Sequence, residues 1–155
     1  ILVVHNDCLV AAIEFKSQRG PSFGNNFNNR TEEALGTAED LWTAYREGAF
    51  GKKNLKPWAG WLMLVEDCEK SNTPVEVAER HFPVRKEFKK TSYAQRYELL
   101  LRKMVLEKKY DAAAFIMATQ KGGIAGKYSE PATDLSMKKF LASLAGHIRT
   151  YLESF

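Results

Sequence analysis

Two continuous apolar runs constrain the fold of this chain more than any other feature. They span residues 58–65 and 112–118. Strands that read as unbroken apolar runs are typical of sheets covered by helices on both faces. Between the runs, Ser92 and Gln95 have the spacing of a capping box, which predicts the start of a helix. The runs are therefore predicted to be buried strands joined by a helical crossover.

A β-hairpin is predicted to begin the sheet. Residues 1–4 and 9–16 are apolar strand patterns, and the turn residues His5-Asn6-Asp7 lie between them. With Asn6-Asp7 as the turn, Val4 is expected to face Leu9, and Ile1 to face Ala12.

The remaining turn and capping residues complete the predicted order of helices and strands. A loop rich in glycine and asparagine is predicted over 17–29, a helix from Asn29 to Gly48, and a final helix over 137–152. Of the 155 residues, 45% are hydrophobic and 27% charged, which suits one compact domain spanning 1–155. The predicted order β-β-α-β-α-β-α is an α/β fold, a mixed β-sheet flanked by helices in a three-layer sandwich.

The second predicted strand carries the candidate chemistry. Residues two apart on a strand point the same way, so Glu14 and Lys16 share one face while Ile13 and Phe15 lie on the other. A carboxylate can hold Mg²⁺ while a lysine orients or deprotonates the water that attacks a phosphodiester. The alternative is an ordinary solvated ion pair on an amphipathic strand.

Two neighbours extend this candidate site. The backbone carbonyl of Phe15 is a candidate second metal ligand. Gln18 continues the face of Glu14 and Lys16, where its amide could hydrogen-bond the phosphate or the water. An exposed glutamine at the end of the strand is the alternative for Gln18.

The polar loop after this strand is a candidate DNA contact, anchored by Phe23 and Phe27. Asparagine can pair with adenine and arginine with guanine at their groove edges. The alternative is asparagine chosen for turns and helix capping, and Glu32 and Glu33 are expected to serve mainly at the start of the following helix. The candidate DNA-binding residues are Ser22, Asn25, Asn26, Asn28, Asn29 and Arg30.

Composition bounds the remaining possibilities. The net charge of +4 fits an anionic partner. No apolar run reaches eighteen residues, so no membrane contact is expected and the predicted location is cytoplasmic. Cys8 and Cys68 have no metal-ligand spacing. Trp58 and Trp61, within an apolar run, are expected to be core residues rather than base-stacking ones.

These residues carry a family resemblance. The PD-(D/E)XK nuclease superfamily places its Glu-x-Lys on the second strand of such a hairpin. Residues 9–36, 42–48 and 143–149 further resemble the type II restriction endonucleases of the XhoI type. The resemblance implies a restriction-endonuclease-like sandwich that cleaves double-stranded DNA at a CTCGAG-type palindrome. It also implies a Mg²⁺-dependent homodimer, and such an enzyme needs a cognate DNA methyltransferase acting on the same site.

The superfamily pattern also requires an aspartate near Glu14. Asp7 is unsuitable because, in the predicted hairpin, it lies ~23 Å from Glu14 at the rise of a strand. The expected register instead places the aspartate about two residues before Ile1. We therefore expect the chain to lack an N-terminal part and to cleave little or nothing by itself. The alternatives are a repair or recombination nuclease of the same fold and a catalytically inactive DNA-binding module.

Overall fold

The computed structural model describes residues 1–51 and 55–154 of the chain. The strands are β1 (Leu2–His5), β2 (Cys8–Gln18), β3 (Trp58–Glu66) and β4 (Ala112–Ala118). The helices are α1 (Phe23–Arg46), α2 (Glu69–Asn72), α3 (Tyr93–Leu106), α4 (Gln120–Ile124) and α5 (Met137–Glu153). Short 3₁₀ turns lie at Lys86–Phe88 and Thr133–Leu135. Along the described part of the chain, the helices are too short or too polar to cross a bilayer.

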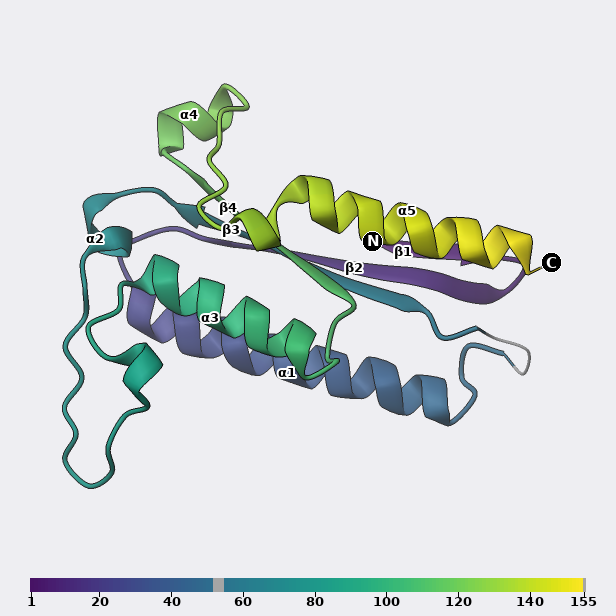
Figure 1. Ribbon diagram of the computed structural model, residues 1–155, viewed down its shortest axis with the longest axis horizontal. Helices are drawn as coiled ribbons and strands as arrows, with labels where there is room; N and C mark the ends of the chain where they lie inside the picture. The colour runs from purple at the N-terminus through teal and green to yellow at the C-terminus, as the bar shows by residue number, and fades with distance from the viewer. Residues whose placement is uncertain (52–54, 155) are drawn as a thin grey trace.

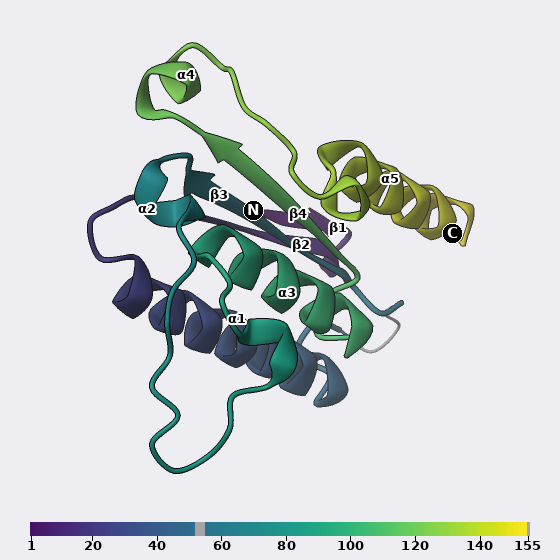
Figure 2. The ribbon, with the colours of Figure 1, turned by 60° about the vertical axis from the view of Figure 1, so that its left-hand side comes forward.

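The four strands form one mixed sheet in the order β1-β2-β3-β4. β1 and β2 are antiparallel, whereas β2, β3 and β4 run parallel to one another. Helices α1 and α3 cover one face of the sheet and α5 covers the other (Figures 1 and 2). The predicted α/β fold, a mixed sheet between layers of helices, is confirmed.

The hairpin turns where the sequence predicted, but its register differs by one residue. Asn6 and Asp7 have φ angles of 49° and 60°, as a two-residue type I′ turn requires. Val4 faces Leu9 as expected. A bulge between Val3 and Val4 then shifts the pairing, so that Leu2 rather than Ile1 faces Ala12.

As a result, Ile1 lies opposite Ile13. The Ile1 amino group donates to the Ile13 carbonyl at 2.7 Å, and the Ile13 amide donates to the Ile1 carbonyl at 2.8 Å. The described part of the hairpin therefore pairs with β2 from Cys8 to Ile13.

Helix α1 begins earlier than the sequence predicted. The expected loop over 17–29 ends at Ser22, and Phe23 is the first helical residue. Phe23 stacks on Tyr93 with ring centroids 5.9 Å apart, and Phe27 meets the ring of Tyr97 edge-on at 5.0 Å. Burial of these two rings on α3 outweighs the weak helix propensity of the asparagines between and after them.

Each face of the sheet has its own apolar layer. Trp61 is fully buried beneath α1 and α3. Trp58, at the start of the same strand, lies on the other face and packs edge-on against Phe140 of α5. The Trp58 indole N–H donates to Ser143 Oγ at 3.0 Å. Both tryptophans are core residues, as predicted.

Candidate active site

The side chains of β2 alternate between the two helical layers as the sequence predicted. Ile13 packs with the apolar layer beneath α5. Glu14, Lys16 and Gln18 point to the opposite face. There Glu14 contacts the segment before β4, Lys16 contacts α1 and Gln18 contacts α3. The Glu-x-Lys pair therefore lies in the space between the β2 edge and α1.

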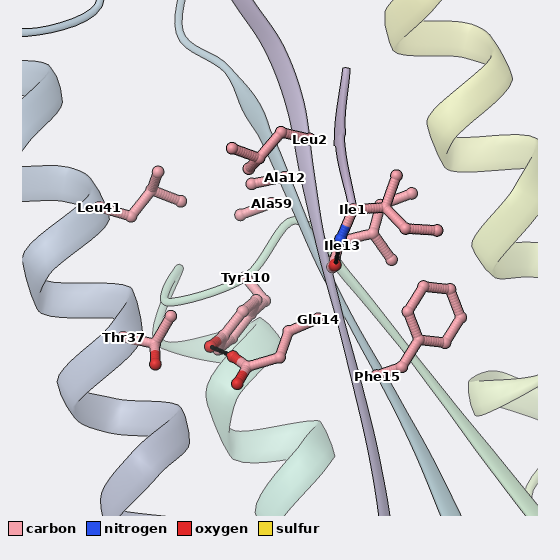
Figure 3. Close-up of a pocket in the computed structure, with 11 residues that line it drawn as sticks. Ile1, Leu2, Ala12, Ile13, Glu14, Phe15, Thr37, Leu41, Ala59 and Tyr110 are labelled. Carbon is pink, nitrogen blue, oxygen red and sulfur yellow. Dashed lines mark hydrogen bonds between the residues drawn. The ribbon is translucent and has the colours of Figure 1, made fainter. Parts of the chain in front are cut away.

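The Glu14 carboxylate has a different partner on each oxygen. Lys16 Nζ lies 2.9 Å from Oε1, and the Tyr110 hydroxyl lies 3.4 Å from Oε2 (Figure 3). A pocket opens beside the carboxylate, bounded by the start of the chain, β2, β3 and α1. Thr37 and Leu41 of α1 line its helical side. Glu14 is thus bound by Lys16 and lies beside the Tyr110 hydroxyl, while one side of it faces an open cavity.

Lys16 is bound by a second carboxylate from α1. Its ammonium lies 3.3 Å from Glu33 Oε2, and Glu33 also pairs with the guanidinium of Arg30 one turn earlier. The bond with Glu14 raises the pKa of Lys16 above its ordinary value, and Glu33 adds to the increase. Arg30, followed by Lys16, holds the pKa of Glu33 below its usual range. Lys16 is therefore a protonated ammonium shared between the carboxylates of Glu14 and Glu33.

This role of Glu33 differs from the sequence prediction. Because α1 begins at Phe23, Glu33 lies about three turns inside the helix, too far from its start to interact with the N-terminal dipole. The next residue, Ala34, is fully buried against the sheet. Burial of Ala34 fixes the rotation of the helix, and this rotation directs Glu33 toward Lys16.

Tyr110 is a site residue that the sequence reasoning missed. It precedes β4, is 3% exposed, and stacks on Trp61 with ring centroids 5.8 Å apart. Its hydroxyl donates to the Ala34 carbonyl at 2.9 Å, and burial raises the pKa of the phenol, which stays neutral. No local motif marks this tyrosine, since its proximity to Glu14 arises from strand pairing and helix packing.

Gln18 is on the predicted face but is buried rather than exposed. Its Nε2 donates to the Phe23 carbonyl at 3.0 Å, and the Tyr97 hydroxyl donates to its Oε1. The alternative of an exposed glutamine at the strand end is therefore wrong. A catalytic role for Gln18 stays a prediction, and its amide here ties the start of α1 to α3.

The candidate DNA-binding residues lie on a helix instead of a loop. Ser22 precedes α1, and the other five residues occupy its first two turns. Asn25, Asn28 and Asn29 are exposed along one helical stripe. Arg30 lies on the side of the active site, paired with Glu33, and its buried Nε has no partner among the described residues. DNA contact by these residues stays a prediction.

The oxygen atoms at the β2 edge could supply some of the ligands that a divalent cation needs. Ile13 directs its N–H and C=O toward Ile1, and these groups alternate in direction along a strand, so the Phe15 carbonyl points to the same edge. It joins the Glu14 carboxylate as a second hard oxygen donor, the type that Mg²⁺ prefers. Within residues 1–51 and 55–154, no three acidic, histidine or cysteine side chains cluster as a complete metal site. Asp7 lies in the hairpin turn before β2, whereas Glu14 lies in the second half of that strand, so the two carboxylates are not brought together.

Comparison with known proteins supplies an independent line of evidence. The sequence profile described as "Restriction endonuclease XhoI" matches residues 1–130. The type II restriction enzyme BstVI of Geobacillus stearothermophilus is 56% identical over 142 residues, which are 92% of this chain and 63% of that protein. The type II restriction enzyme XhoI of Xanthomonas vasicola is 59% identical over 107 residues, 69% of this chain and 43% of that enzyme. AbrI of Azospirillum brasilense, also a type II restriction enzyme, is 66% identical over 82 residues, 53% of this chain and 36% of AbrI.

The chain thus spans less than two thirds of the length of these relatives. No solved structure matches it.

Proposed function

Because the chain belongs to the XhoI restriction endonuclease family, we propose that the protein is a type II restriction enzyme that hydrolyses double-stranded DNA at a specific site. The observation that carries this proposal is the Glu14–Lys16 pair, which lies on one face of β2 beside an open pocket. A carboxylate and an ammonium 2.9 Å apart can divide the work of phosphodiester hydrolysis between them.

The residues present suggest a role for each group. Glu14, with the carbonyl of Phe15, would hold Mg²⁺, which when bound would stabilise charge on the scissile phosphate and acidify an attacking water. Lys16 would donate hydrogen bonds to the phosphate oxygens or the water. Gln18 would support this end of the strand through its bonds to Phe23 and Tyr97.

An aspartate one residue before Ile1 would complete the proposed metal site. The proposal is supported by the Ile1–Ile13 pair, because a residue directly before Ile1 in the same register would face Glu14. Opposite residues of an antiparallel pair point to the same face, so an aspartate there would reach the same cation. The bulge in the hairpin moves this proposed position one residue closer to Ile1 than the sequence suggested.

The remaining parts of the proposal follow from the target. We propose a CTCGAG-type palindrome, and a two-fold symmetric duplex is matched by a homodimer that presents one site to each strand. The exposed asparagine stripe of α1 and Arg30 are the proposed DNA contacts. A cell that contains this nuclease would protect its own DNA with a methyltransferase of the same specificity.

Cleavage of a plasmid of known sequence tests the proposal. The protein expressed from its whole gene is incubated with the plasmid and Mg²⁺, and a parallel sample contains EDTA. We expect discrete fragments whose sequenced ends map to one palindrome, and no cleavage with EDTA. Smears or loss from DNA ends would instead indicate a repair nuclease. DNA binding without any cleavage would indicate a binding module.

A further inference from the structure

Lys16 is shared by carboxylates from two different elements. Glu14 approaches from its own strand at 2.9 Å, and Glu33 approaches from α1 at 3.3 Å. The side chains of Lys16 and Glu14 are 26% and 20% exposed, so their interaction is only partly screened by solvent. An ammonium has three donors and can bind both carboxylates at once.

Glu14 cannot serve Lys16 and a cation equally well. The proposed Mg²⁺ would compete with Lys16 for the Glu14 carboxylate, whose Oε1 now binds the ammonium, and it would repel the ammonium. Lys16 then needs another anchor if its ammonium is to stay beside the reacting phosphate.

We propose that Glu33 is a positioning residue that holds the Lys16 ammonium in the active site when Glu14 is engaged by a divalent cation. This inference rests on the proposed nuclease function, because it concerns the exchange of partners between Glu14 and a metal. It assigns to helix α1 a part in the chemistry of the β2 strand that precedes it.

The surroundings of Glu33 are built to keep it in place. Arg30 binds the Glu33 carboxylate from the preceding turn of the same helix. Ala34, the next residue, is fully buried, and its carbonyl accepts the Tyr110 hydroxyl at 2.9 Å. Glu33 therefore extends from a section of α1 whose rotation and height above β2 are both fixed.

Glu32 provides a matched control. It is exposed, adjacent to Glu33 on the same helix, and has the same charge and size. Glu32→Gln removes the same charge from α1 without removing a partner of Lys16. Differences between Glu33→Gln and Glu32→Gln therefore report the contact rather than the net charge.

Carbodiimide cross-linking tests the contact without requiring activity. This reagent joins an amine to a carboxylate that touches it, and trypsin releases a Lys16–Glu33 link as the peptide that ends at Arg19 joined to peptide 31–46. A Lys16–Glu14 link remains inside the peptide that ends at Arg19. In the protein from the whole gene, we expect both links without metal, and Mg²⁺ should reduce the Glu14 link several-fold while the Glu33 link persists or increases.

Kinetics test the consequence. We expect Glu33→Gln to lower kcat by about 10- to 100-fold with KM within about twofold, because misplacing a catalytic group by about 1 Å costs this much. Glu33→Asp should restore part of kcat, and Glu32→Gln should stay within about twofold of wild type. A purely structural role would lower the yield or stability of Glu33→Gln without this separation of kcat from KM.

The possible failures are distinct. Absence of the Lys16–Glu33 link from the folded protein, or an unchanged kcat in Glu33→Gln, which cannot form that link, would overturn the role of Glu33. If Mg²⁺ leaves both links unchanged and the wild type does not cleave DNA, the proposed nuclease function fails. A Glu33 link that disappears together with the Glu14 link on addition of Mg²⁺ would also overturn the inference, because Lys16 would then have left its second anchor.

Discussion

Tyr110 and Glu14 lie 96 positions apart in the sequence, yet the tyrosine hydroxyl is 3.4 Å from the Glu14 carboxylate. The same hydroxyl donates to the Ala34 carbonyl at 2.9 Å, so one buried side chain connects the segment before β4, the β2 strand and helix α1. A phenol has one proton to donate, and the shorter distance assigns it to Ala34. The Glu14 carboxylate therefore lies beside a neutral hydroxyl whose proton is donated to the Ala34 carbonyl.

Replacing Tyr110 with phenylalanine should separate packing from hydrogen bonding. Tyr110→Phe keeps the ring on Trp61 and removes only the hydroxyl. We expect the free energy of unfolding to fall by about 1 kcal/mol, the usual worth of one hydrogen bond. Urea unfolding gives this value. Tyr45→Phe is the control, because the Tyr45 hydroxyl makes no hydrogen bond within the described part of the chain while its ring packs on Trp42. Equal losses of unfolding free energy in both variants would contradict the prediction.

Removal of the Lys16 ammonium should abolish most cleavage and leave the fold intact. Lys16→Ala removes the group proposed to contact the phosphate or the water, and we expect a loss of about 100-fold or more in kcat. Single-turnover cleavage of a plasmid measures this loss. The exposed Lys138 provides the comparison, and Lys138→Ala should cleave normally. Cleavage by Lys16→Ala at the wild-type rate would refute the proposed role.

Gly60 is required by the packing of β3 against α5. A Cβ at this position would lie 2.3 Å from the ring of Trp58 and 2.7 Å from that of Phe140, and both rings are buried. Gly60→Ala is expected to lower the free energy of unfolding by about 1–3 kcal/mol, as overpacked cores do. Gly146→Ala, in α5 with nothing near its Cβ, should instead stabilise by about 0.5–1 kcal/mol. Thermal unfolding should give a lower Tm for Gly60→Ala and a higher Tm for Gly146→Ala than for the wild type.

The Asp134–Arg102 pair should make the free energy of unfolding depend on pH in the acidic range. Arg102 binds the carboxylate through two nitrogens, at 2.7 and 2.9 Å, and holds the pKa of Asp134 below its ordinary value. The stabilisation is present above the unfolded-state pKa of about 3.9 and is lost as pH falls through the lower pKa of the folded state. Because both side chains are more than a third exposed, we expect less than about 1 kcal/mol from this pair.

Asp134→Asn should therefore be less stable than wild type near pH 7, and the difference should shrink as the pH falls below the unfolded-state value of about 3.9. Urea unfolding across this range, with Asp40→Asn as an exposed control, measures the effect. A stability difference that does not change with pH would assign the effect to something other than ionisation of Asp134.

Several features could be predicted because they depend on neighbours in sequence. The alternation of a strand alone places Glu14 and Lys16 on one face. The unbroken apolar runs indicated strands buried on both sides, and β3 and β4 are such strands. The Asn6-Asp7 turn needed only residues that accept positive φ.

Other features could not be predicted from local patterns. The start of α1 depends on Phe23 and Phe27 meeting Tyr93 and Tyr97, which lie on another helix. Local propensity treats an asparagine-rich segment as a loop, and only the burial of these rings makes it helical. The one-residue shift of the hairpin likewise depends on a bulge that no residue pattern indicated.

The sequence by itself determined which strand carries the chemistry and which side chains of that strand share a face, since both follow from the period of a strand. Only the tertiary structure decided what surrounds them. Glu33 and Tyr110 reach Lys16 and Glu14 because parallel strand pairing and the burial of Ala34 against the sheet bring α1 and the residue before β4 to the same face of the sheet. Contacts between distant segments depend on how whole elements pack, and that information is spread over the complete core.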